Sequence, residues 1–103
     1  MTSRRGVEIS EAAKADIADI HAHIANDSPQ NADLMVARIL KTVGRLARFP
    51  YTGRPRPELG RDTRGLVEWP YVILYKVRVE RVEIARVLNG VRNIAALIKR
   101  SKE

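Results

Sequence analysis

One short apolar run in the second half of the chain limits the possible folds more than any other feature. Val72, Ile73, Leu74 and Tyr75 follow one another without a polar break. Because neighbouring side chains of a strand point to opposite faces, an unbroken run of β-favouring residues predicts a strand that is covered on both faces. We therefore expect residues 71–77 to form the central strand of a sheet.

Pro70 stands directly before this strand and follows another β-favouring segment, residues 65–69. Because proline has no N–H to donate, it is best tolerated where the pairing between strands has lapsed. Pro70 therefore divides residues 65–69 from the central strand. Two separate strands and one kinked strand both satisfy this pattern.

Two segments in the first half of the chain have the apolar periodicity of amphipathic helices. Ser10 follows residues 7–9, a predicted short strand, and is a good N-cap for the first helix. Ser28 and Pro29 begin the second helix as its N-cap and first residue, and we expect it to end near Arg48. Two such helices joined by a short loop predict an antiparallel helical hairpin.

The buried faces of these helices follow from the spacing of their apolar residues. The first helix is expected to bury Ala13, Ile17, Ile20 and Ile24. The second is expected to bury Ala32, Val36, Ile39, Val43 and Leu46, with Met35 and Leu40 widening the stripe. Asp16 and Asp19 are expected to face solvent on the other side of the first helix.

The segment between the second helix and the sheet, residues 49–60, holds three of the five prolines and two of the six glycines. This composition predicts a loop, and the interleaved tyrosine and arginine residues suggest that it lies ordered against the body. After the central strand we expect a turn at residues 79–81, and then a partner strand at residues 82–89. A short final helix is predicted at residues 94–102.

The partner strand has Val82, Ile84 and Leu88 on one expected side, and Arg86 interrupts that side. An edge or paired surface arginine is the favoured interpretation of Arg86. The alternative is an arginine that opens into a groove.

The expected elements are a strand, two helices, a loop, two or three antiparallel strands and a tail. Because helices and strands are segregated along the sequence, an α+β fold is predicted rather than a parallel α/β fold. We expect one domain over residues 1–103, with the helical hairpin packed on one face of a small, mainly antiparallel sheet. The other face of the sheet is then left for binding.

The charge of the chain indicates an acidic partner. The net charge is +7, and it is unevenly distributed. Residues 1–53 carry seven Lys and Arg against six Asp and Glu, whereas residues 54–103 carry twelve against six. The positive field therefore belongs mainly to the predicted sheet, and it suits a nucleic acid, an acidic protein or a ribosome surface. A merely solvated surface is the alternative.

Several classes of protein do not fit the composition. No run approaches the roughly 18 apolar residues that a membrane-spanning helix needs, and the first residues do not resemble a secretory signal. We therefore expect a cytoplasmic protein that does not associate with membranes. The chain has no cysteine, which removes disulfides, thiolate nucleophiles and sulfur-rich metal sites.

The motifs that carry catalysis or cofactors are also missing. The sequence shows no phosphate-binding glycine loop, metal-ligand cluster or serine–histidine–acid set, so we expect no catalytic residue, cofactor or metal. His21 and His23, two positions apart on a helix, point in different directions and do not suit a shared metal ion.

Arginines next to the predicted sheet are the candidate binding residues, because guanidinium groups bind phosphates and carboxylates. Trp69 is added because an aromatic residue beside basic ones can stack on a partner, although a core or interface position is the more ordinary role. The candidate residues for binding a partner are Arg54, Arg56, Arg61, Arg64, Trp69, Arg86 and Arg92.

These features together resemble the ParE branch of the ParE/RelE superfamily of bacterial toxins. The resemblance extends over about 85 residues and depends on the order and spacing of several short motifs. They are Val-Glu-Ile-Ser10 with Ala-Lys-Ala-Asp-Ile17 and Ile20, Phe49-Pro50 with Gly53-Arg54, Asp62-Thr-Arg-Gly-Leu66, Pro70-Tyr-Val-Ile-Leu-Tyr75, and Val87-Leu-Asn-Gly-Val-Arg92.

The resemblance implies the toxin of a type II toxin–antitoxin module, in which the C-terminal segment of a cognate antitoxin wraps the toxin. ParE-like toxins bind and poison DNA gyrase, whereas RelE-like toxins cut mRNA on the ribosome. RelE-like members often carry arginine where this chain has Val72, and a late tyrosine or histidine that is missing after Tyr75. Arg92 is similar to a RelE active-site arginine, and Asn89 replaces a histidine of many ParE-like members.

The resemblance therefore favours a non-enzymatic inhibitor of DNA gyrase. Its partner is expected to be an antitoxin with an N-terminal DNA-binding domain, in a hetero-oligomer. We expect the chain itself to make no sequence-specific contact with nucleic acid. The alternatives are a RelE-like mRNA endonuclease and a member without toxicity that only binds its antitoxin.

Overall fold

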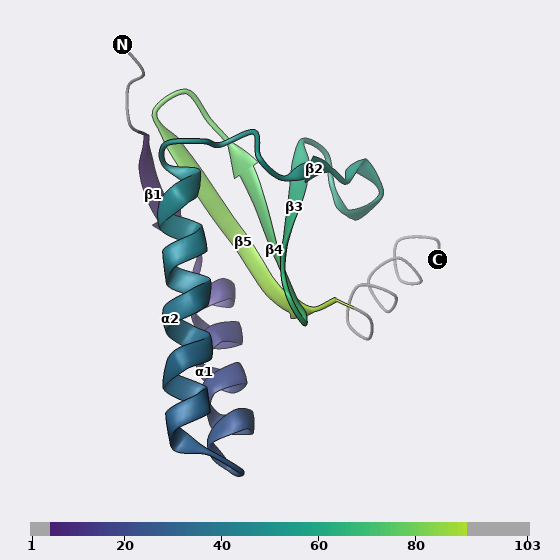
Figure 1. Cartoon of the computed structure of the whole chain (residues 1–103). Coiled ribbons are helices and arrows are strands. Elements are labelled where there is room, and N and C mark those ends of the chain that lie inside the picture. The colour runs from purple at the N-terminus through teal and green to yellow at the C-terminus, as the bar shows by residue number, and fades with distance from the viewer. Residues whose placement is uncertain (1–4, 91–103) are drawn as a thin grey trace.

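The computed structural model describes residues 5–90, so that the helix expected at residues 94–102 and Arg92 lie outside the described residues. The elements follow the expected order (Figure 1). They are β1 (Gly6–Ile9), α1 (Glu11–Ala25), α2 (Pro29–Leu46), β2 (Arg54–Pro55), a 3-10 turn η1 (Pro57–Leu59), β3 (Thr63–Glu68), β4 (Tyr71–Val77) and β5 (Arg81–Asn89). The predicted α+β fold is confirmed.

The five strands form one mixed sheet in the order β1-β5-β4-β3-β2. β1 pairs in parallel with β5, and the other neighbours are antiparallel. Glu68 pairs with Tyr71, so Trp69 and Pro70 form the connection between β3 and β4. The peptide bond between Trp69 and Pro70 is cis. The sequence thus contains two strands here, not one kinked strand.

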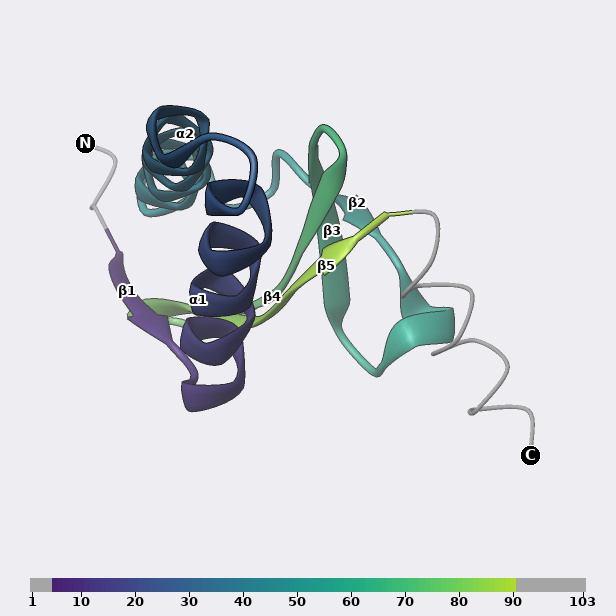
Figure 2. The same cartoon turned by 90° about the horizontal axis from the view of Figure 1, so that it is seen from below.

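Both helices cover the same face of the sheet (Figure 2). The core between helices and sheet includes the fully buried Ile39, Leu46, Ile73, Tyr75 and Ile84. A second, smaller apolar cluster consists of Val72, Leu74 and Leu88, with Leu59 packed against it. Because successive β4 side chains alternate between these clusters, the prediction of a central strand covered on both faces is confirmed.

The helices begin as the sequence predicts. The Ser10 hydroxyl accepts a hydrogen bond from the Ala13 N–H, and the Ser28 hydroxyl accepts one from the Asn31 N–H. The buried stripe of α2 differs at one flank, where Leu40 is 45% exposed and the expectation of a buried Leu40 is wrong. Thr42 is buried instead, since its hydroxyl bonds a carboxylate at the end of β3.

A β-bulge in β5 changes which side chains face the helices. Leu74 pairs with Arg86 but Tyr75 pairs with Ile84, so Ala85 is an extra residue on β5. One extra residue reverses the alternation of the strand. Val87 therefore joins Ile84 in the helix-side core while Leu88 lies in the second cluster. The prediction that Val82, Ile84 and Leu88 share one side is wrong for this reason.

Side chains of α1 and its cap cover the edge of β5 at the bulge. β1 pairs with β5 only as far as Ile84, which leaves the next backbone groups without a strand partner. The Ser10 hydroxyl donates to the Ala85 carbonyl at 2.8 Å, and an Asp16 carboxylate oxygen accepts from the Val87 N–H at 3.0 Å. The edge is thus closed by a helix rather than by a strand.

Asp16 also pairs with Arg86, through hydrogen bonds of 2.8 and 2.9 Å to its two carboxylate oxygens. The Asp16 side chain is only 12% exposed, so the expectation that it faces solvent is wrong. Its hydrogen bonds raise the pKa of Arg86 further above the ordinary value. Arg86 is therefore a paired arginine, as the favoured interpretation has it.

We expect Asp16→Ala to lower the free energy of unfolding by about 2–3 kcal/mol, because it leaves the Val87 N–H without an acceptor and Arg86 without its carboxylate. Urea unfolding followed by circular dichroism measures the loss. Asp19→Ala is the matched control, since Asp19 is exposed on the same helix, and its effect should stay within about 0.5 kcal/mol. Equal losses for the two variants would show that the bulge contacts contribute nothing.

Candidate functional site

The loop after α2 is fixed to the sheet by one buried hydroxyl group. Tyr75 is 0% exposed, and its hydroxyl accepts from the Gly53 N–H and donates to the Pro50 carbonyl, both at 2.8 Å. Burial raises the pKa of Tyr75. A Cβ on Gly53 would lie 2.6 Å from the Tyr75 hydroxyl, so only glycine fits there. The expectation that residues 49–60 lie ordered against the body is confirmed.

Arg64 on β3 holds the same loop from outside. One of its guanidinium nitrogens donates to the Gly53 carbonyl at 2.7 Å. Its guanidinium carbon lies 4.9 Å from the centre of the Tyr51 ring, and that of Arg5 lies 5.8 Å from the same centre. Tyr51 is thereby held in place although it is 60% exposed. Tyr51 and Arg64 line one side of a pocket of about 370 Å³.

The pairing of β2 with β3 places two further candidate arginines, Arg54 and Arg56, beside the strand of Arg64, and Arg61 lies in the turn before that strand. Because Pro55 pairs with Arg64, the side chains of Arg54 and Arg56 lie on the face of Gly65, opposite to Arg64, and a Cβ on Gly65 would meet Arg56 Cγ at 3.2 Å. Arg56 is paired with Glu58 at 3.3 Å. Within residues 5–90, the exposed side chains of Arg54 and Arg61 have no hydrogen bond or ion pair. We call Arg54, Arg56, Arg61, Arg64 and Tyr51 the arginine end.

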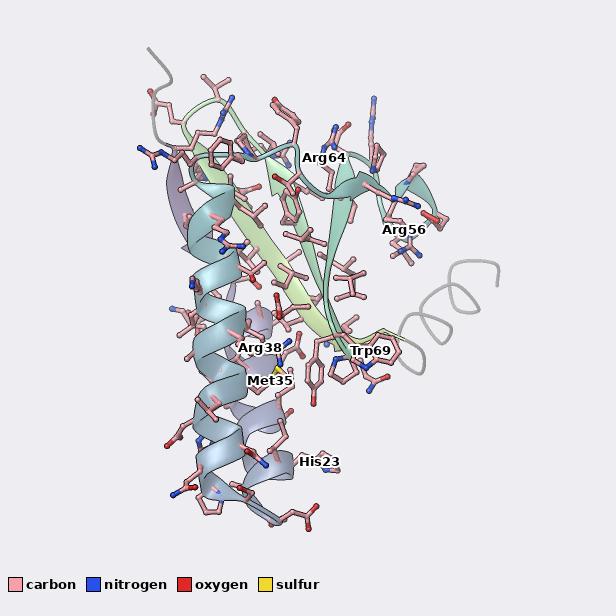
Figure 3. The ribbon with its side chains drawn as sticks, viewed as in Figure 1. His23, Met35, Arg38, Arg56, Arg64 and Trp69 are labelled. Carbon is pink, nitrogen blue, oxygen red and sulfur yellow. The ribbon has the colours of Figure 1, made fainter. Side chains whose placement is uncertain are left out.

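Trp69 lies at the other end of the sheet (Figure 3). It is 68% exposed in the turn between β3 and β4, so it is not a core residue. Val67, on β3, is 60% exposed and adds a second apolar side chain close in sequence. We call Trp69 and Val67 the tryptophan end.

The tryptophan end is tied to α2 by the Glu68 carboxylate. It accepts hydrogen bonds from the Thr42 hydroxyl at 2.8 Å and from the Arg38 guanidinium at 2.7 and 3.1 Å. The Thr42 hydrogen bond and, to a lesser degree, Arg38 lower the pKa of Glu68 against the effect of burial. Sequence reasoning missed this contact, because its members are 26 and 30 positions apart and no local pattern joins them.

The remaining candidates lie apart from both ends or outside the described residues. Arg86 is held by Asp16 beside α1, and Arg92 is not among residues 5–90. Within that part of the chain, no group of acidic and histidine side chains is arranged to hold a metal ion. No helix there is long and apolar enough to cross a membrane. The structure thus places four of the seven candidate residues at one end of the sheet, on two faces.

We expect Tyr75→Phe to lower the free energy of unfolding by about 1–3 kcal/mol, because it leaves the Gly53 N–H and the Pro50 carbonyl unpaired in a buried site. Thermal and urea unfolding measure the change. The pKa of Tyr75 in the folded protein is raised above the ordinary value of 10.0. The stabilisation by its hydroxyl is therefore complete below pH 10.0 and declines as the pH rises above that value.

The control is Tyr51→Phe, which removes an exposed tyrosine hydroxyl that has no partner among residues 5–90. Its free energy of unfolding should change by less than about 0.5 kcal/mol. If Tyr75→Phe proves equally mild, water or a shifted loop replaces the two hydrogen bonds.

Comparison with known proteins now tests the resemblance. A family model described as the ParE toxin of the type II toxin–antitoxin system parDE matches residues 7–94. The putative toxin Y4kP of Sinorhizobium fredii is 37% identical over 92 residues, which cover 85% of this chain and 91% of the relative. Toxin ParE3 of Caulobacter vibrioides is 35% identical over 71 residues, which cover 69% of this chain and 71% of the relative.

A solved structure agrees with the fold. A chain from the structure titled "Chromosomal ParDE TA system from P. aeruginosa" superimposes with a TM-score of 0.71, covering 84% of this chain and 97% of that chain. At 23% sequence identity this likeness concerns the fold. The family match and the two relatives confirm the resemblance to the ParE branch, and the chain therefore belongs to the ParE toxin family of type II toxin–antitoxin systems.

Proposed function

We propose that this chain is a toxin that inhibits DNA gyrase by binding to it in the cytoplasm, and that a cognate antitoxin neutralises it. The family match over residues 7–94 is the observation that carries this proposal. The arginine end supports it, because Arg54 and Arg61 are exposed cations without internal partners. Such side chains are available for the carboxylates of a protein target.

The placement of the polar groups favours binding over RNA cleavage. Cleavage needs groups that activate the ribose hydroxyl and protonate the leaving oxygen. Tyr75 is unsuited to this, since its hydroxyl is buried and engaged by two backbone groups. Val72 is buried in the second apolar cluster. The two histidines of the chain, His21 and His23, both lie on α1 rather than on the sheet.

The tryptophan end suits the antitoxin. Exposed tryptophan is a typical anchor of protein interfaces, and Val67 adds apolar surface beside it. We propose that an apolar segment of the antitoxin covers Trp69 while its acidic residues meet the basic surface of the sheet. The complex is then a hetero-oligomer in which the antitoxin supplies the DNA-binding domain.

Purified wild-type chain should inhibit DNA supercoiling by gyrase. Arg54→Glu and Arg61→Glu, made singly, should each raise the concentration needed for half inhibition by about tenfold, because each reverses a charge at the contact. Lys14→Glu is the control of equal charge change, since Lys14 and its partner Glu11 are both exposed on α1. It should inhibit like the wild type.

Two other results would each support a different function. Inactivity against gyrase together with cleavage of mRNA on the ribosome would replace this proposal with the RelE-like activity. Harmless expression without the antitoxin, with antitoxin binding retained, would identify a member that has lost its toxicity.

Trp69→Ala should weaken the binding of the cognate antitoxin by about 2 kcal/mol, or roughly 30-fold, as expected for an interface anchor. Titration calorimetry measures the affinity. Val79→Ala is the control, because Val79 is 89% exposed in the turn between β4 and β5, at the other end of the sheet. Unchanged affinity for the Trp69 variant would place the antitoxin on another surface.

A further inference from the structure

The outer side of α2 carries cations that the fold does not use. Lys41, Arg45 and Arg48 follow one another at spacings of four and three, which places them on one side of the helix and its last turn. All three are exposed, and the buried residues of α2 lie on the opposite side. We call these three residues the basic ridge. α2 runs along an outer edge of the molecule (Figure 1).

The charges of the basic ridge are not neutralised within the described residues. No side-chain hydrogen bond or ion pair joins Lys41, Arg45 or Arg48 to any other part of residues 5–90, and the Arg45 side chain acts only at a distance on Glu68. Asp33, the one acid of α2, is bonded to His21 at the far end of the helix. Since like charges four positions apart destabilise a helix, the ridge is a local cost of the fold that an external anion would offset.

Gly44 lies between Lys41 and Arg45 and has no packing role in the chain. A Cβ at Gly44 would meet nothing within 4 Å, and glycine inside a helix costs about 1 kcal/mol relative to alanine. Because Gly44 has no side chain, a partner molecule with a wide surface can approach the helix closely beside the ridge. Between Lys41 and Arg48 the exposed side chains are all cationic, and the exposed apolar side chains that flank them, Leu40 and Phe49, lie outside the ridge.

We propose that the basic ridge binds the phosphate backbone of duplex DNA without reading its bases. Lys41 and Arg48 are seven positions apart, which is about 10 Å along a helix, and the phosphates of one DNA strand rise about 3.4 Å each, so that roughly three successive phosphates are within reach. The choice of DNA rests on the proposed function, because gyrase holds duplex DNA. The arginine end then contacts the enzyme while the ridge contacts the DNA beside it.

The test measures binding of the purified chain to a fluorescent duplex of arbitrary sequence between about 50 and 200 mM KCl. Three phosphate contacts give a slope of log K against log salt near −2.7, or about a 40-fold loss over this range. Lys41→Gln/Arg48→Gln should reduce the slope to near −0.9, or about a fourfold loss. Arg45 is left unchanged because its charge helps to lower the pKa of Glu68.

Lys14→Gln/Lys76→Gln removes the same charge from α1 and β4 and should keep the wild-type slope. An equal flattening by both double variants would mean diffuse attraction to a basic protein and would overturn the proposal. So would an unchanged slope in the ridge variant, or binding of a poly-glutamate peptide in preference to DNA. Circular dichroism confirms that each variant is folded.

Failure of this proposal differs from failure of the proposed function. A chain that inhibits gyrase but shows no ridge-dependent DNA binding overturns the ridge alone. A chain that binds DNA through the ridge but leaves gyrase active overturns the target and not the phosphate contact.

Discussion

The burial of β4 on both faces is the constraint on which the rest of this structure depends. A strand covered on both sides needs two layers, and the helical hairpin supplies only one of them. Tyr75 then uses its place in this strand to reach the loop after α2, because its ring fills the core while its hydroxyl extends to buried backbone groups of that loop. The arginine end is therefore positioned from the middle of the sheet.

Arginine has several roles in this chain, and the difference lies in what stands within reach of each guanidinium group. Arg86 pairs with Asp16 beside the edge of β5. Arg64 bonds the Gly53 carbonyl and lies over the Tyr51 ring, so it stabilises the loop after α2. Arg54 and Arg61 meet no partner among residues 5–90. A positively charged sequence thus resolves into cations that hold the fold and cations that remain for other molecules.

Much of the fold could be predicted because its signals are local. The apolar run in β4, the Ser10 and Ser28 caps and the helical periodicity all lie within short segments of sequence. The bulge at Ala85 could not be predicted, because it is defined only by the pairing of β5 with a second strand, and it moved Leu88 to the other face.

The candidate site, like the fold, was predictable only where its signals are local in the sequence. Clustering of arginines near Arg64 was predictable from their closeness in sequence, which β2–β3 pairing preserves. The burial of Asp16 and the contact of Thr42 with Glu68 were not, since their partners lie 26 to 71 positions away and the residues themselves look like ordinary polar helix positions. Which arginines are free also depends on such distant partners.

The parallel pairing of β1 with β5 has a consequence for how the chain is made. Gly6 pairs with Arg81, so β1 leaves the ribosome long before β5, its neighbour in the described sheet, has been made. The Ser10 and Asp16 side chains, which bond the edge of β5, also have no partner there until β5 has been made. β2, β3 and β4 can pair earlier, but the described sheet is complete only once β5 has been made, and a protein truncated before β5 lacks part of the core.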